Sequence, residues 1–163
     1  MKLFRIFTFL IFSLTFSKLK AQVTISPVFF TVDDSITETF DASLSKPSGA
    51  LLGATTVYMH SGVITNLSVG PSDWKHTIGN WGKNDGIGQM ASIGNNKWQI
   101  KYLPRNYYSI PANETVSKIA FVFRNADGSK EGKDATTGGD IFVSVPMSGN
   151  GLSVKVTSPN VFP

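Results

Sequence analysis

Hydrophobic and polar residues alternate with a period of two along most of this chain. This alternation places every second side chain on the same face of an extended segment, so it predicts β-strands. The spacing of three to four residues that marks an amphipathic helix does not emerge in any stretch. The alternating runs, and therefore the expected strands, cover residues 35–40, 55–61, 74–78, 97–103, 117–124 and 140–145.

Two of these runs predict core positions directly. In 97–103, Trp98, Ile100 and Tyr102 share one face and polar residues occupy the other, so Trp98 is expected in the core. The run 117–124 carries apolar side chains on both faces, which is typical of a fully buried strand. Its first apolar face carries Ile119, Phe121 and Phe123.

The other runs predict which side chains share a face. In 55–61, Val57 and Met59 lie on one side, and Tyr58 and His60 lie on the other. One face of 35–40 is expected to carry Ile36 and Phe40. One face of 74–78 is expected to carry Trp74, His76 and Ile78.

Clusters of Gly, Pro, Asn, Asp and Ser separate the expected strands, at 45–49, 79–88, 94–96, 125–128 and 136–139. Many short strands with such turns predict an all-β fold, a single immunoglobulin-like or carbohydrate-binding-module β-sandwich. We expect it to occupy residues 22–148. The last segment, 149–163, is expected to be a linker or the start of a following domain.

The N-terminal residues 1–21 have the pattern of a secretory signal peptide: a basic start, a short apolar run and a small residue at the end. No cysteine follows for lipid attachment, so no membrane anchor is expected, and the chain is expected to be secreted or displayed at the cell surface. Four of the fifteen basic residues lie in this segment, namely Lys2, Arg5, Lys18 and Lys20. The remainder has eleven basic and eleven acidic residues, so it lacks the positive charge that nucleic-acid binding requires.

Signs of catalysis are sparse, and whether the chain is an enzyme stays open. There are two histidines, His60 and His76, and no cysteine. Neither a nucleophile-elbow motif nor a zinc-protease motif occurs, although a Ser-His-Asp set can be dispersed along a chain. The segment 86–91 matches the dinucleotide-binding pattern but lacks the strand before it and the helix after it.

A calcium site is a second possibility for chemistry, although we expect no cofactor. Carboxylate and amide oxygens occur close together in a glycine-rich segment, as calcium ligands often do. The alternative, which we favour, is that Asp127-Gly128 forms a turn and Asp140 opens a strand. The residues concerned are Asn125, Asp127, Asp134 and Asp140.

Aromatic residues give the strongest functional signal. The stretch 74–90 contains two of the three tryptophans among Gly, Asn and Asp residues. Flat aromatic rings bordered by short polar side chains suit sugars, which have apolar faces edged by hydroxyl groups. Trp81, flanked by Asn80 and Gly82, is expected to be exposed, whereas the pattern leaves Trp74 open between core and surface.

Four segments together resemble a known module: V-Y-M-H-S-G, then W-x-x-x-x-G-N-W-G-K-N-D-G-I-G-x-M, then K-W-Q-I, then F-V-F-R-N-A-D-G followed by G-G-D-I-F-V. The chain is similar, over residues 23–145, to starch-binding carbohydrate-binding modules of secreted proteins in glycan-degrading Gram-negative bacteria. The resemblance implies binding of an α-glucan polysaccharide or oligosaccharide, and an attached glycoside hydrolase domain as a possible covalent partner. The ligand-binding residues that it implies are Tyr58, His60, Trp74, Trp81, Lys83, Asn84, Arg124 and Asp127.

Two other functions remain open at this point. The chain can be a structural immunoglobulin-like spacer without a ligand, with its aromatic residues in the core. It can also be a small secreted hydrolase that uses His60 or His76. The missing lipoprotein cysteine departs from the anchored starch-binding proteins of these bacteria.

Overall fold

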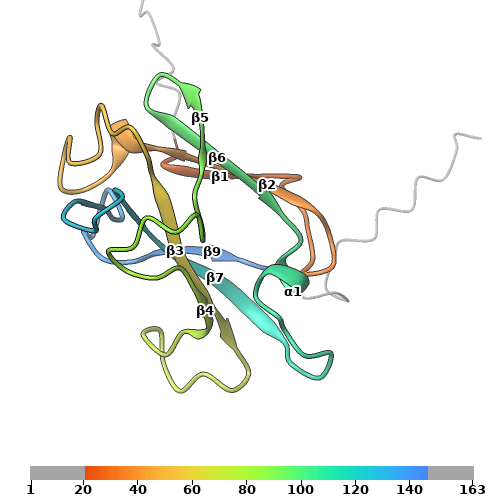
Figure 1. The fold of residues 1–163 in the computed structure, drawn as a ribbon. Coiled ribbons are helices and arrows are strands. Elements are labelled where there is room, and N and C mark those ends of the chain that lie inside the picture. The colour runs from red at the N-terminus through yellow and green to blue at the C-terminus, as the bar shows by residue number, and fades with distance from the viewer. Residues whose placement is uncertain (1–20, 147–163) are drawn as a thin grey trace, which may run out of the picture.

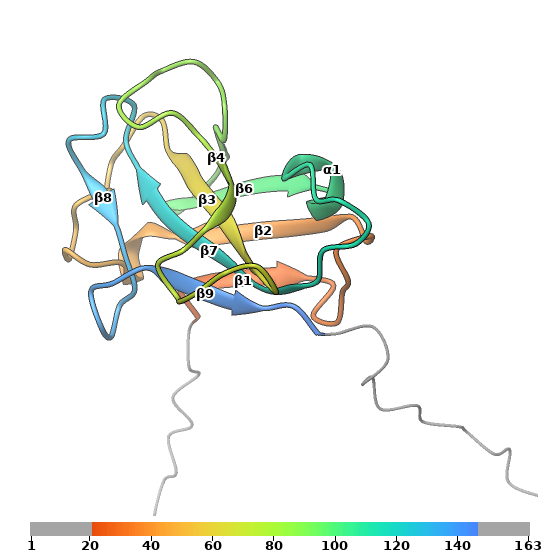
Figure 2. The ribbon, with the colours of Figure 1, turned by 90° about the horizontal axis from the view of Figure 1, so that it is seen from below.

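A computed structural model describes residues 21–146, which form two antiparallel β-sheets packed face to face (Figures 1 and 2). The expected signal segment, apart from Ala21, and the tail 149–163 lie outside these residues. The first sheet has the order β1-β2-β6-β5, with bounds Val23–Ser26 (β1), Ile36–Asp41 (β2), Lys97–Tyr102 (β6) and Ala91–Gly94 (β5).

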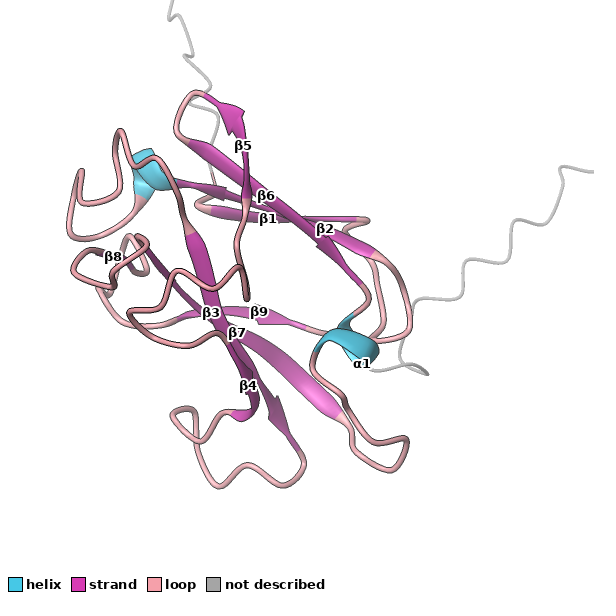
Figure 3. Ribbon diagram, viewed as in Figure 1, coloured by secondary structure: helices cyan, strands magenta, loops and turns pink. Residues whose placement is uncertain are grey.

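The second sheet has the order β4-β3-β7, and the far edge of β7 pairs with both β8 and β9. Its strands are Lys75–Ile78 (β4), Tyr58–Thr65 (β3), Val116–Arg124 (β7), Glu131–Gly132 (β8) and Ile141–Ser144 (β9). The helical segments are a 3-10 turn, Ala42–Leu44, and one short helix, Pro104–Tyr107 (α1), as Figure 3 shows. Among the described residues, no helix is long and apolar enough to span a membrane.

The distribution of the strands between the sheets is that of an immunoglobulin-like sandwich. Strands β1, β2, β5 and β6 form one sheet, and β3, β7 and β9 form the other, with β4 added at its edge. The prediction of an all-β sandwich is therefore confirmed.

The core lies between the sheets and is built from the faces that the alternation predicts. Phe40 of β2 and Phe123 of β7 stack across it, with their ring centroids 3.8 Å apart. Gly132 of β8 lies beside this pair, and a Cβ there would lie 2.9 Å from the ring of Phe40. Trp98 is buried, as expected, with 5% of its surface exposed.

Strand β4 departs from the expected alternation. Ile78 packs against the core. The Cβ of Trp74 lies on the opposite face of the sheet, 3.1 Å from the position that a Cβ on Gly62 would occupy. His76 between them has a left-handed backbone (φ 51°), and the pairing with β3 shifts register at this point. This β-bulge adds one residue, so the prediction that Trp74, His76 and Ile78 share a face is wrong.

A polar cluster interrupts the hydrophobic core. Glu38 of β2 is fully buried, and its Oε2 accepts a 2.8 Å hydrogen bond from the hydroxyl of Tyr102. Tyr107 and Tyr108 pack around Tyr102, and the Tyr108 hydroxyl donates to Ser61 at 2.9 Å. Glu38 Oε1 has no hydrogen-bond partner among the described residues. Burial raises the pKa of Glu38 to about 8, so this carboxyl is protonated at neutral pH.

The segment before β5 joins β3 through a glycine that admits no side chain. Gly88 accepts a 2.7 Å hydrogen bond from Met59 N, and a Cβ on Gly88 would lie 2.2 Å from the carbonyl oxygen of Met59. We therefore expect Gly88→Ala to lower the free energy of unfolding by about 2–4 kcal/mol, measured by urea denaturation. Gly86 is a matched control because it also has a positive φ but open space around it, so Gly86→Ala should cost only about 1 kcal/mol. Equal losses in both variants would contradict the steric explanation.

Candidate functional site

The outer face of the second sheet carries most of the residues expected to bind a ligand. Because alternate residues of β3 point away from the core, Tyr58, His60 and Gly62 lie on this face. The register places them beside alternate residues of β7, in the pairs Tyr58–Arg124, His60–Val122 and Gly62–Ala120.

Three aromatic rings meet on this face, and we call His60, Trp74 and Trp81 the aromatic patch. The ring of His60 lies between the two tryptophans, with its centroid 6.1 Å from Trp74 and 5.5 Å from Trp81. The contact with Trp81 is edge to face, which is a favourable aromatic geometry. Residues from β3, the β3–β4 loop and the β4–β5 loop thus converge.

His60 contributes a neutral ring to the aromatic patch. Burial lowers the pKa of its imidazole, and the cation of Arg124 lowers it further, while the carbonyl of Gly79 opposes both effects. Nδ1 of His60 lies 2.9 Å from the Gly79 oxygen, so Nδ1 donates and the ring is fixed in one tautomer. The His60 ring is therefore held in one orientation against both indoles.

Trp81 is the exposed member of the patch, with 45% of its surface in contact with solvent, while Trp74 is half-buried. A Cβ on Gly128 would lie 2.9 Å from Trp81 Nε1, so the indole packs directly on the turn at Gly128. Since Gly128 has a φ of 72°, this turn both requires a glycine and leaves room for the ring. The indole is therefore held from two sides and exposed on another.

Arg124 holds this arrangement together from beneath. Its side chain is fully buried, and its guanidinium donates to the carbonyl oxygens of Asn80 and Lys83 at 2.7 and 2.9 Å. It also donates to the carbonyls of Asn125 and Ala126 at 2.9 and 3.0 Å. One side chain thus ties the Trp81 loop to the turn after β7.

Tyr58 lies under the same loop. The guanidinium carbon of Arg124 is 4.5 Å from the centroid of its ring, and its hydroxyl donates to Asn84 Oδ1. Both Tyr58 and Arg124 are fully buried. Direct ligand contact by these two residues, which the resemblance implies, does not fit their positions, because the loop that they support covers them.

The remaining expected contacts are exposed: Lys83 and Asn84 on the Trp81 loop, and Asp127 at the turn that packs against this loop. The loop carrying the first two is further fixed by Asn80, whose side chain donates to Asp85 at 2.8 Å. Hydrogen bonds to the Asn80 side chain and the Ile87 amide lower the pKa of Asp85, so it is charged at neutral pH. Neither the hydrophobic pattern nor any motif indicates this hydrogen bond between Asn80 and Asp85, although both residues belong to the same loop as Trp81.

The acidic residues considered as calcium ligands close turns. Asp127 Oδ1 accepts from the amide and hydroxyl of Ser129, and Asp134 Oδ1 accepts from Thr136 and Thr137. Across residues 21–146, no group of three or more acidic or histidine side chains is placed to hold a metal ion. The turn expected at Asp127-Gly128 is present.

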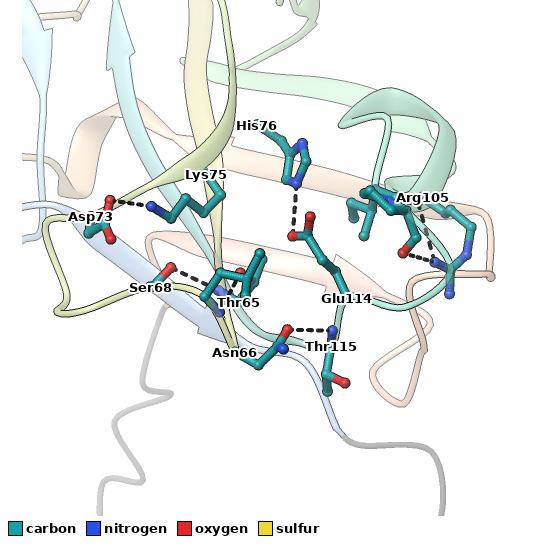
Figure 4. A network of polar contacts seen from close by, with 12 residues as sticks. Thr65, Asn66, Ser68, Asp73, Lys75, His76, Arg105, Glu114 and Thr115 are labelled. Atoms are coloured by element: carbon teal, nitrogen blue, oxygen red, sulfur yellow. Dashed lines mark hydrogen bonds and ion pairs between the residues drawn. The ribbon is translucent and has the colours of Figure 1, made fainter.

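His76, the other histidine, has a hydrogen-bond partner that does not belong to the aromatic patch. Its Nε2 is 2.9 Å from Glu114 Oε2, and Figure 4 shows the two side chains facing each other between β4 and the segment before β7. Within the described residues, neither His60 nor His76 forms a hydrogen bond with a serine hydroxyl. The geometry therefore offers no observation in favour of a serine hydrolase.

A family model described as a domain of unknown function, DUF8578, matches residues 23–131, which is two-thirds of the chain. The chain belongs to the DUF8578 family. The matched DUF8578 region runs from β1 into β8, so it includes the aromatic patch and Arg124. Among curated proteins, none matches this DUF8578 protein.

The exposure of the tryptophans predicts how the DUF8578 protein responds to iodide. Trp81 is 45% exposed and Trp98 is 5% exposed, so Trp81 should account for most of the quenchable emission. Trp81→Phe is expected to remove at least about half of the quenchable fraction, and the matched variant Trp74→Phe should remove less because Trp74 is half-buried. Unchanged quenching in Trp81→Phe would show that its indole is covered.

Proposed function

We propose that this protein is a non-catalytic carbohydrate-binding module that holds an α-glucan such as starch against the aromatic patch. In this proposal the chain is exported and acts outside the cell. A glycoside hydrolase domain on the same polypeptide is its proposed partner.

One observation carries this proposal: a buried arginine fixes a loop that leaves a tryptophan 45% exposed. Burying a guanidinium removes its hydration, and this cost is offset here by hydrogen bonds to four carbonyl groups. An indole that only filled space would gain more from full burial. A rigid, exposed indole instead provides a surface that binds a flat apolar ligand without first paying an ordering cost.

The polar groups around the indole suit a sugar. Lys83 provides hydrogen-bond donors, Asp127 provides acceptors, and Asn84 provides amide donors because its Oδ1 already accepts from Tyr58. Sugar hydroxyls donate and accept, so they can bond to all three while an apolar face of the ring stacks on Trp81. The loop carries both a positive residue, Lys83, and a negative one, Asp85, which favours a neutral ligand over a strongly charged one.

A shallow surface of this kind binds each ligand weakly because it buries little of the sugar. The benefit arises from linkage: a module held on polymer raises the local concentration of the substrate for an attached domain. Weak binding to short sugars and stronger retention on polymer are therefore expected together.

The test is co-sedimentation of the exported chain, residues 22–163, with insoluble polysaccharides. We expect depletion from solution by granular starch, competition by maltoheptaose, and no depletion by cellulose. Equal depletion by both solids would contradict the assignment to α-glucans. Absence of depletion by any glycan would favour the spacer function.

A further inference from the structure

A cavity of about 320 Å³ lies beside the aromatic patch, between the loop 50–56 and the turn 125–130. Its volume is at the lower end of the range for small-molecule sites. Small side chains make this space, since Ala50, Ala54 and Ala126 line it together with Gly53. The loops that form it follow β2 and β7 and lie close together at one end of the sandwich (Figure 1).

Several polar groups of the residues that line this cavity are uncommitted, whereas the side-chain amide of Asn125 is bonded to Ser129 and to the backbone of Lys130. Within residues 21–146, no hydrogen bond or ion pair uses the hydroxyls of Thr55 and Thr56, the ammonium of Lys130 or Oδ2 of Asp127, all of which belong to lining residues. Asp127 uses only Oδ1 to close its turn. The cavity therefore offers two hydroxyls, one cation and one carboxylate oxygen to a ligand.

This mixture indicates the chemistry of the ligand. One positive and one negative side chain cancel, so the cavity selects for neither an anion nor a cation. A carboxylate accepts hydrogen bonds, an ammonium donates them and a threonine hydroxyl does both. A neutral molecule with many hydroxyl groups satisfies all of them, and small apolar side chains leave room for its ring.

The cavity and the aromatic patch lie on either side of one turn. A Cβ on Gly82 would lie 3.2 Å from the carbonyl oxygen of Asp127, and one on Gly128 would lie 3.0 Å from Gly82 N. The turn that supports Trp81 thus also forms a wall of the cavity. A chain of sugar units that stacks on Trp81 reaches the cavity by crossing this turn.

We propose that the cavity is a second sugar subsite, which takes a further unit of the same glucan chain that stacks on Trp81. This inference rests on the proposed function. It makes the module selective for oligosaccharides long enough to occupy both positions.

A cavity at a different set of loops provides a contrast. It encloses about 370 Å³ and is lined by Asp33, Arg105 and Glu114 among others. Its charges are already paired: Arg105 Nη2 donates to Asp33 Oδ2 at 2.9 Å, and Glu114 accepts from His76 (Figure 4). Paired side chains leave little for a ligand, so this cavity carries no such proposal.

The test is isothermal titration with maltooligosaccharides from maltose to maltoheptaose. Ala126→Leu fills the cavity from the turn, and Thr55→Leu fills it from the opposite loop, so a folding failure in one variant leaves the other. Each is expected to weaken maltoheptaose binding on the order of ten-fold, the loss of one or two hydrogen bonds, and to leave maltose binding unchanged. Ala135→Leu is the matched control, since Ala135 is an exposed alanine outside the cavity lining, and it should bind as the unaltered protein does.

The outcomes separate the two proposals. If the unaltered protein binds maltoheptaose and both cavity variants bind it equally well, the second subsite is wrong and the proposed function stands. If the unaltered protein binds no member of the series, the proposed function fails and the subsite fails with it.

Discussion

Replacing Arg124 by methionine is expected to lower the free energy of unfolding by about 3–5 kcal/mol, one of the largest effects of any single substitution in this protein. A methionine side chain fills similar space but cannot donate hydrogen bonds. The four carbonyl groups that Arg124 now satisfies, from Asn80, Lys83, Asn125 and Ala126, would each lose a charge-assisted hydrogen bond.

The loss should also extend to the aromatic patch. The Trp81 loop and the turn at Gly128 are joined through this guanidinium, so the indole should lose its fixed position when the arginine is removed. We expect the emission of Trp81 to become more accessible to iodide in Arg124→Met at temperatures below its unfolding transition. Arg124→Lys should recover only part of the stability, because the three donors of a compact ammonium group cannot form hydrogen bonds with all four carbonyl groups.

Arg105→Met is the matched control for the loss of an arginine. Arg105 is partly exposed and pairs with the exposed Asp33, so its removal should lower the free energy of unfolding far less than the removal of Arg124 does. Urea denaturation of both variants gives the comparison. Similar losses for Arg124→Met and Arg105→Met would contradict the clamping role of Arg124.

The second large effect concerns pH. We expect the free energy of unfolding to fall by about 4 kcal/mol between pH 4.5 and pH 8, through Glu38 alone. Burial raises the pKa of Glu38 from 4.5 to about 8, with the hydrogen bond from Tyr102 opposing that rise. The buried carboxyl therefore keeps its proton in the folded protein while the unfolded chain releases it.

The sign follows from the direction of this shift. Below pH 4.5 both states hold the proton, and the contribution to stability is fully present. As pH rises, only the unfolded state loses the proton, so stability falls until the folded state also ionises near pH 8. The neighbouring Tyr102, Tyr107 and Tyr108 have pKa values raised by burial, so they do not titrate in this window.

Glu38→Gln removes the titratable carboxyl and keeps an oxygen that accepts the hydrogen bond from Tyr102. The variant therefore isolates the contribution of Glu38 ionisation to the pH dependence of stability. Its unfolding free energy should change little between pH 4.5 and pH 8, whereas that of the unaltered protein declines. Thermal denaturation at half-unit pH intervals measures both. Parallel curves for the two proteins would show that Glu38 carries no raised pKa in the folded state.

Much of the fold could be predicted from the sequence because alternation reports which face of a strand meets a core. It placed the strands later found as β2, β3, β4, β6, β7 and β9. Strand β1 does alternate, with Val23 and Ile25 packed against the core, but its four residues are too few for a prediction. The strands β5 and β8 gave no such signal, because β5 is exposed along its whole length and β8 has two residues. Pairing with a neighbour, rather than burial, defines these strands, and pairing leaves no periodic pattern.

The candidate site was less predictable for a related reason. Alternation correctly put Tyr58 and His60 on the face of β3 opposite Met59, but it cannot tell what covers a face. The loop 79–90 folds over Tyr58 and Arg124 and leaves Trp81 exposed. Glu38 illustrates another limit, since it shares the buried face of β2 with Ile36 and Phe40, although a charged residue type by itself favours exposure.

Affinity electrophoresis in gels with and without soluble starch tests the central claim most directly. We predict that starch retards residues 22–163, that Trp81→Ala abolishes this retardation, and that both proteins unfold with similar free energies because Trp81 is already 45% exposed. Ile87→Ala is the matched control, since Ile87 is an equally exposed apolar residue of the same loop, and it should be retarded like the unaltered protein. Retardation that persists in Trp81→Ala, or that is absent from the unaltered protein, would contradict binding through the aromatic patch.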